Sequence, residues 1–389
     1  MERFVFFSSV LALAAAAWAG EVVTASVEDP EGVLGRMGAP VAAEVVLPPS
    51  LLAAAREGKL VVAEAGGEAV PAQFEPTDGA KGLLWWLMPE GQGAKRTFRV
   101  QVSAAQQARA MTATFVKETG RVEVREEGKP ILRYNFLTVP VPKGVGGRYA
   151  VARSDYVHPL YGPAGEVLTL DYPRDHPHHR GIYWAWPEVS YKGKTHDLHA
   201  LQGVFARPVR LVRAEAGPVM AVVEAESRWM WEDKEPIVRE VAIIRAFAAG
   251  RDGRCVDFEF RFTALVEGVT VARRHRDLYG GFNLRFSARR GQKIVHRDGW
   301  GQLVGIPPGG KSPVGVAILQ HPANPRYPGD WVKYPNLNWL QPTFPSKGER
   351  FPLGSKEPLV LRYRLWVHGG AATENQLTDQ ARAFAALKF

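Results

Sequence analysis

Apolar and polar residues alternate along most of the chain. The clearest run is residues 256–263, where Val, Phe, Phe and Phe alternate with Asp, Glu, Arg and Thr, and residues 359–368 repeat the pattern. Because successive side chains of a β-strand point to opposite faces, this period predicts strands with one apolar and one polar face. Further strands are expected at residues 41–47, 59–63, 83–88, 97–102, 121–126, 131–136, 221–231, 240–247, 281–288 and 314–320.

Only one segment has a convincing helical pattern. Residues 374–387 follow Thr373 as an N-cap, and Gln376 stands three positions later, which is the spacing of a capping box. Alanine-rich pieces at residues 51–56 and 104–110 are expected to form helical turns. Many short strands with one terminal helix predict an all-β protein.

The alternation is interrupted near residues 103–112, between two strand-rich regions. We expect a small N-terminal immunoglobulin-like sandwich at residues 20–103, followed by a large two-sheet β-sandwich at residues 112–389 that ends in the helix. Its fold is all-β. Two long stretches of the second region, 156–203 and 321–351, lack alternation and are expected to be loops, where function commonly resides.

The first residues have the features of an export signal. Arg3 precedes an apolar run at residues 5–18, and Ala17-Trp18-Ala19 has the small-x-small form of a cleavage site. We therefore expect residues 1–19 to be a signal peptide and the mature protein to be periplasmic or secreted. No later segment approaches the roughly 20 apolar residues of a membrane helix, so no membrane span is expected. Cys255 is the only cysteine, so the chain cannot form an internal disulfide. We expect Cys255 to be a structural thiol.

Composition indicates the kind of partner. Lys and Arg exceed Asp and Glu by 49 to 40, a net charge of +9, which favours acidic ligands. The basic residues are scattered along strands, without a cluster interleaved with aromatic residues, which together with the export signal argues against nucleic acid. A small-molecule or oligosaccharide ligand, anionic forms included, is the expected partner.

The candidate chemistry lies in the run from Asp175 to Gly181. Five of the ten histidines fall between positions 176 and 199, and we expect His176, His178 and His179 to act as catalytic acid or base. In an extended segment His176 and His178 point to one side and His179 to the other, so the three converge only if the chain turns.

Two kinds of chemistry are open to the pair His176 and His178. The pair can exchange protons with a substrate, which requires no cofactor, or it can chelate one divalent metal ion. Arg180 brings positive charge close to the pair, and we therefore favour proton exchange over a bound cation.

Neighbouring residues are expected to bind the substrate. Arg180 and Asp175 can hold its oxygen atoms, and the following aromatic strand offers flat faces for a sugar through Tyr183, Trp184 and Trp186. Further substrate contacts are assigned to residues at which strand pattern gives way to loop: His158, His321, Arg326 and His368. The sequence has no Gly-x-Ser-x-Gly elbow, P-loop, dinucleotide fingerprint or His-Glu-x-x-His motif.

Several motifs resemble a bacterial family labelled methane oxygenase PmoA. They are Tyr-Val-His-Pro-Leu-Tyr-Gly at 156–162, Asp-His-Pro-His-His-Arg-Gly-Ile-Tyr-Trp-Ala-Trp at 175–186, and the segments 279–285, 321–326 and 361–369, so the resemblance covers roughly residues 112–370. It implies a fold similar to galactose mutarotase and a role in carbohydrate catabolism. Methane oxidation itself is excluded, because a membrane monooxygenase subunit needs several spanning helices and the sequence has none after its signal.

Two functions of different classes remain open. The first is a carbohydrate-active enzyme of the epimerase, lyase or hydrolase type that uses histidine acid/base chemistry on a sugar or uronide. The second is a metal-binding or glycan-binding protein without turnover.

Overall fold

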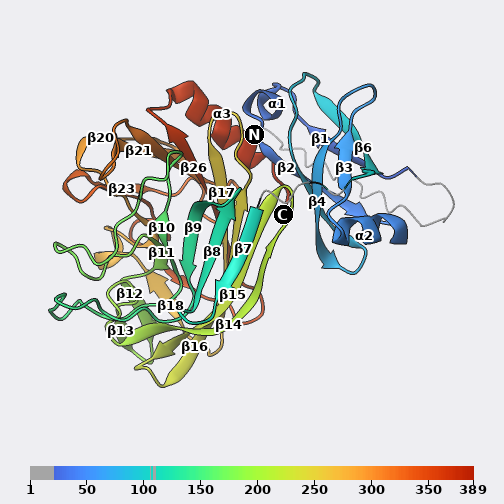
Figure 1. Ribbon diagram of the computed structural model, residues 1–389. Coiled ribbons are helices and arrows are strands. Elements are labelled where there is room, and N and C mark those ends of the chain that lie inside the picture. The colour runs from blue at the N-terminus through green and yellow to red at the C-terminus, as the bar shows by residue number, and fades with distance from the viewer. Residues whose placement is uncertain (1–21, 106, 108–110) are drawn as a thin grey trace, which may run out of the picture.

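The computed structural model describes residues 22–105, 107 and 111–389, and in them it shows an antiparallel β protein with three α-helices (Figure 1). The expected fold class is confirmed. The expected signal peptide at residues 1–19 lies outside the described residues, as does part of the alanine-rich piece at 104–110. Across the described ranges, no helix has the length and apolar character needed to cross a bilayer.

The N-terminal region is a six-stranded antiparallel sheet with the order β1-β6-β3-β4-β5-β2. It has a hydrophobic cluster of its own, in which the rings of Trp86 and Phe98 lie 5.2 Å apart. Helix α1, which the sequence pattern did not indicate, is held between Gly32 and Gly38, both in the left-handed region. The elements are β1 (Thr24–Glu28), α1 (Val33–Met37), β2 (Pro40–Val46), α2 (Pro49–Arg56), β3 (Leu60–Ala63), β4 (Val70–Asp78), β5 (Lys81–Leu87) and β6 (Lys95–Val102).

Two eight-stranded antiparallel sheets form the second region. The first has the order β23-β24-β19-β11-β10-β9-β8-β7. Its strands are β7 (Met111–Val116), β8 (Arg121–Glu126), β9 (Lys129–Asn135), β10 (Tyr156–Leu160), β11 (Ile182–Ala185), β19 (Gly281–Arg285), β23 (Trp331–Tyr334) and β24 (Trp339–Pro342). Strand β11 matches the aromatic strand expected there, whereas β10, β23 and β24 come from stretches expected to be loops, because strands of four or five residues are too short to show a clear alternation.

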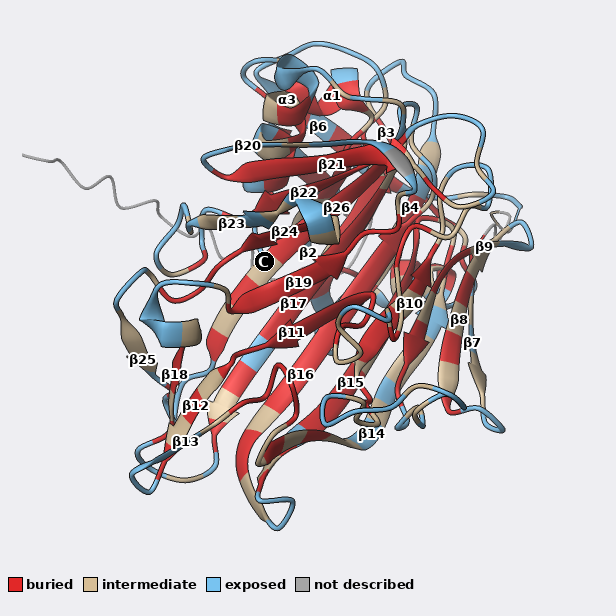
Figure 2. Cartoon of the chain, turned by 90° about the vertical axis from the view of Figure 1, so that its left-hand side faces the viewer, coloured by how far each residue is buried: buried red, intermediate tan, exposed pale blue. Residues whose placement is uncertain are grey.

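The second sheet has the order β14-β15-β16-β17-β26-β22-β21-β20, and its long central strands are buried over most of their length (Figure 2). Its strands are β14 (Val204–Ala216), β15 (Met220–Trp231), β16 (Glu235–Phe247), β17 (Arg254–Ala264), β20 (Arg290–Arg297), β21 (Trp300–Ile306), β22 (Val314–Gln320) and β26 (Leu359–Gly369). A small sheet, β13-β12-β18-β25, lies at one end. It comprises β12 (Glu188–Tyr191), β13 (Lys194–His196), β18 (Thr270–Ala272) and β25 (Arg350–Pro352); two 3₁₀ turns are η1 (Arg274–Arg276) and η2 (Pro335–Leu337).

The main core lies between the two large sheets. Phe258, Phe260 and Phe262 point inward from β17, as their alternation predicts, and belong to one buried cluster. Trp184 from β11 meets Phe260 and Phe262 at ring-centroid distances of 5.4 and 5.3 Å. Burying each such side chain contributes about 1.5–3 kcal/mol, so this layer fixes how the two sheets are stacked.

The first half of the opposite, polar face of β17 is buried as well, whereas Arg261 further along is exposed. Asp257 is 2% exposed and accepts hydrogen bonds of 2.6 and 2.8 Å from Arg364, while Glu259 pairs with Arg362. Burial arises because the C-terminal helix α3 (Glu374–Ala385) packs across this side of the sheet, where Phe384 lies 4.7 Å from the Arg364 guanidinium. The predicted capping box at Thr373 and Gln376 is confirmed.

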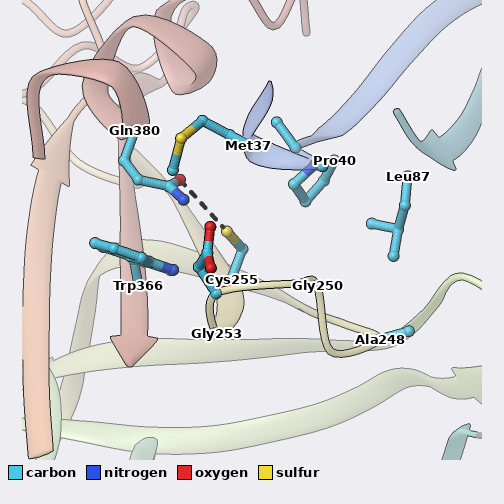
Figure 3. Close-up of a pocket in the computed structure, with 12 residues that line it drawn as sticks. Met37, Pro40, Leu87, Ala248, Gly250, Gly253, Cys255, Trp366 and Gln380 are labelled. Atoms are coloured by element: carbon cyan, nitrogen blue, oxygen red, sulfur yellow. Dashed lines mark hydrogen bonds between the residues drawn. The ribbon is translucent and has the colours of Figure 1, made fainter. Parts of the chain in front are cut away.

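Helix α3 also joins the two regions, because it lies beside α1 (Figure 1). At this junction a small cavity is lined by residues of both regions, among them Met37, Leu87 and Trp366 (Figure 3). Cys255 lies on its wall with its Sγ 3.9 Å from the Gln380 side-chain oxygen, and burial raises the pKa of the thiol to about 11. A buried thiol of this kind stays protonated, which fits a structural role.

Candidate functional site

The histidine-rich segment consists of two consecutive turns. The His176 amide donates to the Pro173 carbonyl at 3.1 Å, and the His179 amide donates to the His176 carbonyl at 2.9 Å. The segment therefore turns instead of extending, which is the condition on which its three histidines converge. The turns stack the His176 and His179 rings at 4.8 Å and bring His178 to 4.6 Å from His179, so all three histidines converge.

Arg180 lies behind these turns. Its guanidinium donates to the carbonyls of Pro177, His179 and Val151 at 2.6, 2.8 and 2.7 Å, and its Nε lies 3.4 Å from Asp171. The side chain is 1% exposed. The substrate-binding role expected for Arg180 has no support in this geometry, because the guanidinium is engaged by the protein and holds the turns in place.

We expect Arg180→Lys to lower the free energy of unfolding by about 2 kcal/mol, because an ammonium group cannot reach carbonyls in three directions as the guanidinium fork does. The loss is measured by urea unfolding. The control is Arg174→Lys, because Arg174 is exposed in the same segment, and this substitution should change the free energy of unfolding by less than about 0.5 kcal/mol. Equal effects of the two substitutions would contradict the bracing role.

A fourth imidazole completes the site. His199 lies between β13 and β14, in a turn where Asp197 accepts a 2.9 Å hydrogen bond from the Ala200 amide and Arg153 donates to the His199 carbonyl at 2.9 Å. Its ring lies 5.2 Å from His178 and 5.4 Å from His179. We call His176, His178, His179 and His199 the histidine cluster. His199 was not a sequence candidate, although the density of histidines up to position 199 was a signal for it.

One face of the first sheet forms the floor of the cluster. Strands β11, β19 and β24 lie side by side (Figure 2). Their register places Tyr183, Asn283 and Arg285 on the same face, and Trp339 on that face as the register partner of Arg285. The Tyr183 hydroxyl lies 2.9 Å from His199 Nε2, and the Trp339 ring lies 4.9 Å from His179.

The alternate residues of β11 point the other way. Trp184 and Trp186 are 3% and 0% exposed in the core between the sheets, with their rings 4.7 Å apart. The expectation that they stack on a sugar is wrong, because the packed interior leaves their faces no access to a ligand. Tyr183 is the one aromatic residue of the predicted set that borders the cluster.

The cluster has a graded electrostatic environment. Burial lowers the pKa of His178 to about 3 and also lowers the pKa values of His179 and His199 well below the ordinary value, so these three imidazoles are neutral. His176 lies at the surface, 37% exposed, with Nδ1 3.3 Å from the Asp175 carboxylate. Asp175 is also held by Arg285 at 2.5 Å; partial burial raises its pKa, but this ion pair outweighs burial and the net pKa is lowered.

The other predicted residues lie away from the cluster. His158 is bonded to Thr169 at 2.9 Å, and burial lowers its pKa to about 4. His321 contacts Phe384 of α3, and Arg326 pairs with Glu349 on the surface. His368 packs on Trp366 of β26. Apart from Asp175, Arg180, Tyr183 and the three histidines of the turns, the structure therefore does not bring the predicted site residues together.

A family model described as a family of unknown function (DUF6807) matches residues 121–382. The matched range contains the whole histidine cluster, both large sheets except β7, and most of α3. No curated protein matches the sequence.

Proposed function

The chain belongs to DUF6807, a family of unknown function, and from its histidine cluster we propose that it is an enzyme acting on a sugar or uronide. The observation that carries the proposal is the surface position of His176 and Asp175 above three neutral imidazoles. Epimerisation, elimination and hydrolysis of sugars all need a proton to be moved, and imidazole does this near neutral pH.

His176 is the group best placed for proton transfer. It is the most exposed member of the cluster, so a substrate can approach it, and the Asp175 carboxylate at 3.3 Å orients its ring. Asp175 is itself held by Arg285. This arrangement resembles the general pattern of a base oriented by a carboxylate that a third group fixes.

Aromatic rings beside the cluster favour a sugar as the substrate. Tyr149, 39% exposed, lies 5.2 Å from His178, and the half-buried Tyr279 lies 5.1 Å from His199. Binding sites for small molecules commonly combine such apolar faces with a few polar groups. Arg274 bonds to the Tyr279 hydroxyl at 3.2 Å, pairs with the Asp197 carboxylate and is 30% exposed, so a uronide carboxylate would share this guanidinium with Asp197.

The proposal keeps the expectation that the protein is exported, which rests on residues 1–19. Methane oxidation forms no part of the proposal, because a membrane monooxygenase subunit needs several spanning helices. A glycan-binding protein without turnover is the alternative that the experiment must separate from an enzyme.

The test is turnover by the purified full chain on a panel of neutral sugars and uronides, followed by proton NMR in D₂O. This readout detects anomeric exchange, deuterium incorporation at carbon, and new products. His176→Gln should lower kcat by about 10²–10⁴-fold, the usual contribution of a general acid or base. The control is His296→Gln, because His296 lies in β20 against Trp331 and outside the cluster.

Unchanged kcat in the His176→Gln protein would contradict the assignment. Saturable binding of a panel member without any turnover would overturn the enzyme and support the glycan-binding alternative.

A further inference from the structure

Three members of the histidine cluster meet at one point. One ring nitrogen each of His178, His179 and His199 lies within 4.8 Å of the other two. We propose that these three imidazoles bind a single divalent transition-metal ion, with Zn²⁺ as the first candidate. This ligand set differs from the His176 and His178 pair expected from the sequence, and it joins two segments about 20 positions apart.

The geometry is close to that of a three-histidine site. Zinc–nitrogen bonds of about 2.0–2.1 Å in a tetrahedron place the ligand nitrogens roughly 3.4 Å apart. The observed separations of up to 4.8 Å therefore need a contraction of about 1.4 Å at most, by the same comparison. Rotation of imidazole rings about their side-chain bonds supplies movements of this size without a change in the backbone turns.

Unpaired nitrogens point to a ligand at this place. In the described part of the chain, the Nδ1 atoms of His178 and His199 are buried and have no hydrogen-bond partner. His199 is 1% exposed, so water does not readily satisfy it. Leaving a buried polar atom unsatisfied destabilises the protein, and a metal–nitrogen bond would offset this cost.

The surroundings orient the ligands. Tyr183 lies 2.9 Å from Nε2 of His199, which leaves Nδ1 of that ring for the ion. Metal-binding histidines usually bond through their second nitrogen in this way, which fixes the ring and its tautomer. The three rings are also in the neutral form that binds metals, since burial lowers their pKa values.

Four guanidinium groups oppose a cation here. Arg180 is engaged by three backbone carbonyls and by Asp171, and Arg274 pairs with Asp197. Arg285 lies 3.5 Å from His179 Nδ1, but its charge is offset by the ion pair with Asp175. Arg153 lies over the Tyr183 ring at 4.4 Å and directs its donors to the carbonyls of His199 and Trp184. The positive charges are therefore engaged with carboxylate and carbonyl oxygen atoms.

Three histidine ligands leave a fourth position open, as in zinc sites that perform catalysis. A water molecule or a sugar hydroxyl bound there would become more acidic. The metal site goes beyond the proposed function, because metal binding is measurable whether or not a sugar is turned over.

The experiment measures metal binding by the full chain, purified without a polyhistidine tag and stripped with chelator. Titration with Zn²⁺, and with Co²⁺ as a visible spectroscopic probe, should reach one ion per chain. His199→Ala should weaken Zn²⁺ binding by at least about 100-fold, and Tyr183→Phe by about 10-fold through the ring orientation. His178→Ala serves as a second ligand variant that is less buried, and far-ultraviolet circular dichroism checks the fold of each variant.

His176→Gln distinguishes the two proposals. It should retain one ion per chain with unchanged affinity while it loses turnover. A stoichiometry well below one, or an affinity of His199→Ala and His178→Ala within threefold of the unsubstituted protein, would overturn the metal site. Turnover by a protein that binds no ion in the titration would overturn the metal site and leave the proposed enzyme standing, whereas one tightly bound ion without turnover would support the metal site alone.

Discussion

Glu75→Ala should lower the free energy of unfolding by about 3–5 kcal/mol, the usual cost of removing one partner of a buried ion pair. Glu75 is 5% exposed in the N-terminal sheet and accepts hydrogen bonds of 2.9 and 3.1 Å from Arg245 of β16. It also pairs with Arg213 of β14 and accepts a 3.0 Å bond from Trp85. Removing the carboxylate leaves the Arg245 charge buried without compensation at the junction of the two regions.

The loss is measured by urea unfolding followed by circular dichroism and tryptophan fluorescence, and coincident transitions show whether both regions unfold together. The control is Glu90→Ala, which removes an exposed ion pair with Arg251 across the same junction and should cost less than about 1 kcal/mol. Similar losses for both substitutions would show that the junction does not depend on the buried pair.

The same carboxylate makes stability depend on pH. Burial by itself raises the pKa of Glu75, but Arg245 and Arg213 outweigh burial and the net pKa is lowered. Its contribution is therefore present above the ordinary glutamate pKa and is lost as the pH falls through the lowered value. The loss of stability at acidic pH should therefore be smaller in the Glu75→Ala protein than in the unsubstituted protein.

Glu240→Gln should stabilise the protein at pH 8 by about 3 kcal/mol and have an effect below about 1 kcal/mol at pH 5. Glu240 is buried in β16, where burial, together with the nearby Asp155, outweighs the lowering effects of the Trp229 hydrogen bond and Arg153 and raises its pKa from 4.5 to about 8. A folded-state pKa above the unfolded value means that stability falls as the pH rises between these two values. Glutamine keeps an acceptor for the 2.6 Å hydrogen bond from Trp229 and removes the ionisation.

The measurement is urea unfolding of both proteins at half-unit steps from pH 5 to pH 8. The control is Glu226→Gln in the adjacent strand β15, because hydrogen bonds from Arg239 and Arg210 lower the pKa of Glu226. Glu226→Gln should lower the free energy of unfolding at neutral pH, whereas Glu240→Gln should raise it. Parallel pH profiles for the Glu240→Gln and unsubstituted proteins would refute the buried, protonated state of Glu240.

Local sequence determined the secondary structure of this protein well where elements are long. The period of two at residues 256–263 and 314–320 corresponds to strands β17 and β22, because each strand's alternation is set by its own backbone. The capping box at Thr373 specified the start of α3 for the same reason. Short strands such as β11 and β24 have four residues each, which is too few for a period of two to be recognised. The aromatic residues of β11 indicated a strand there, whereas β24 had no such signal.

The sequence also determined where the chemistry is concentrated, because a run with three histidines within four positions is visible without a structure. Only the tertiary structure decided which side chains share the site. The stacking of two sheets turned Trp184 into the core and Tyr183 toward the imidazoles, and a turn after β13 delivered His199. The same packing brought the Arg180 guanidinium against backbone carbonyls, to which it donates hydrogen bonds. These outcomes depend on contacts between segments far apart in the chain, whereas alternation and capping depend on contacts within a few residues.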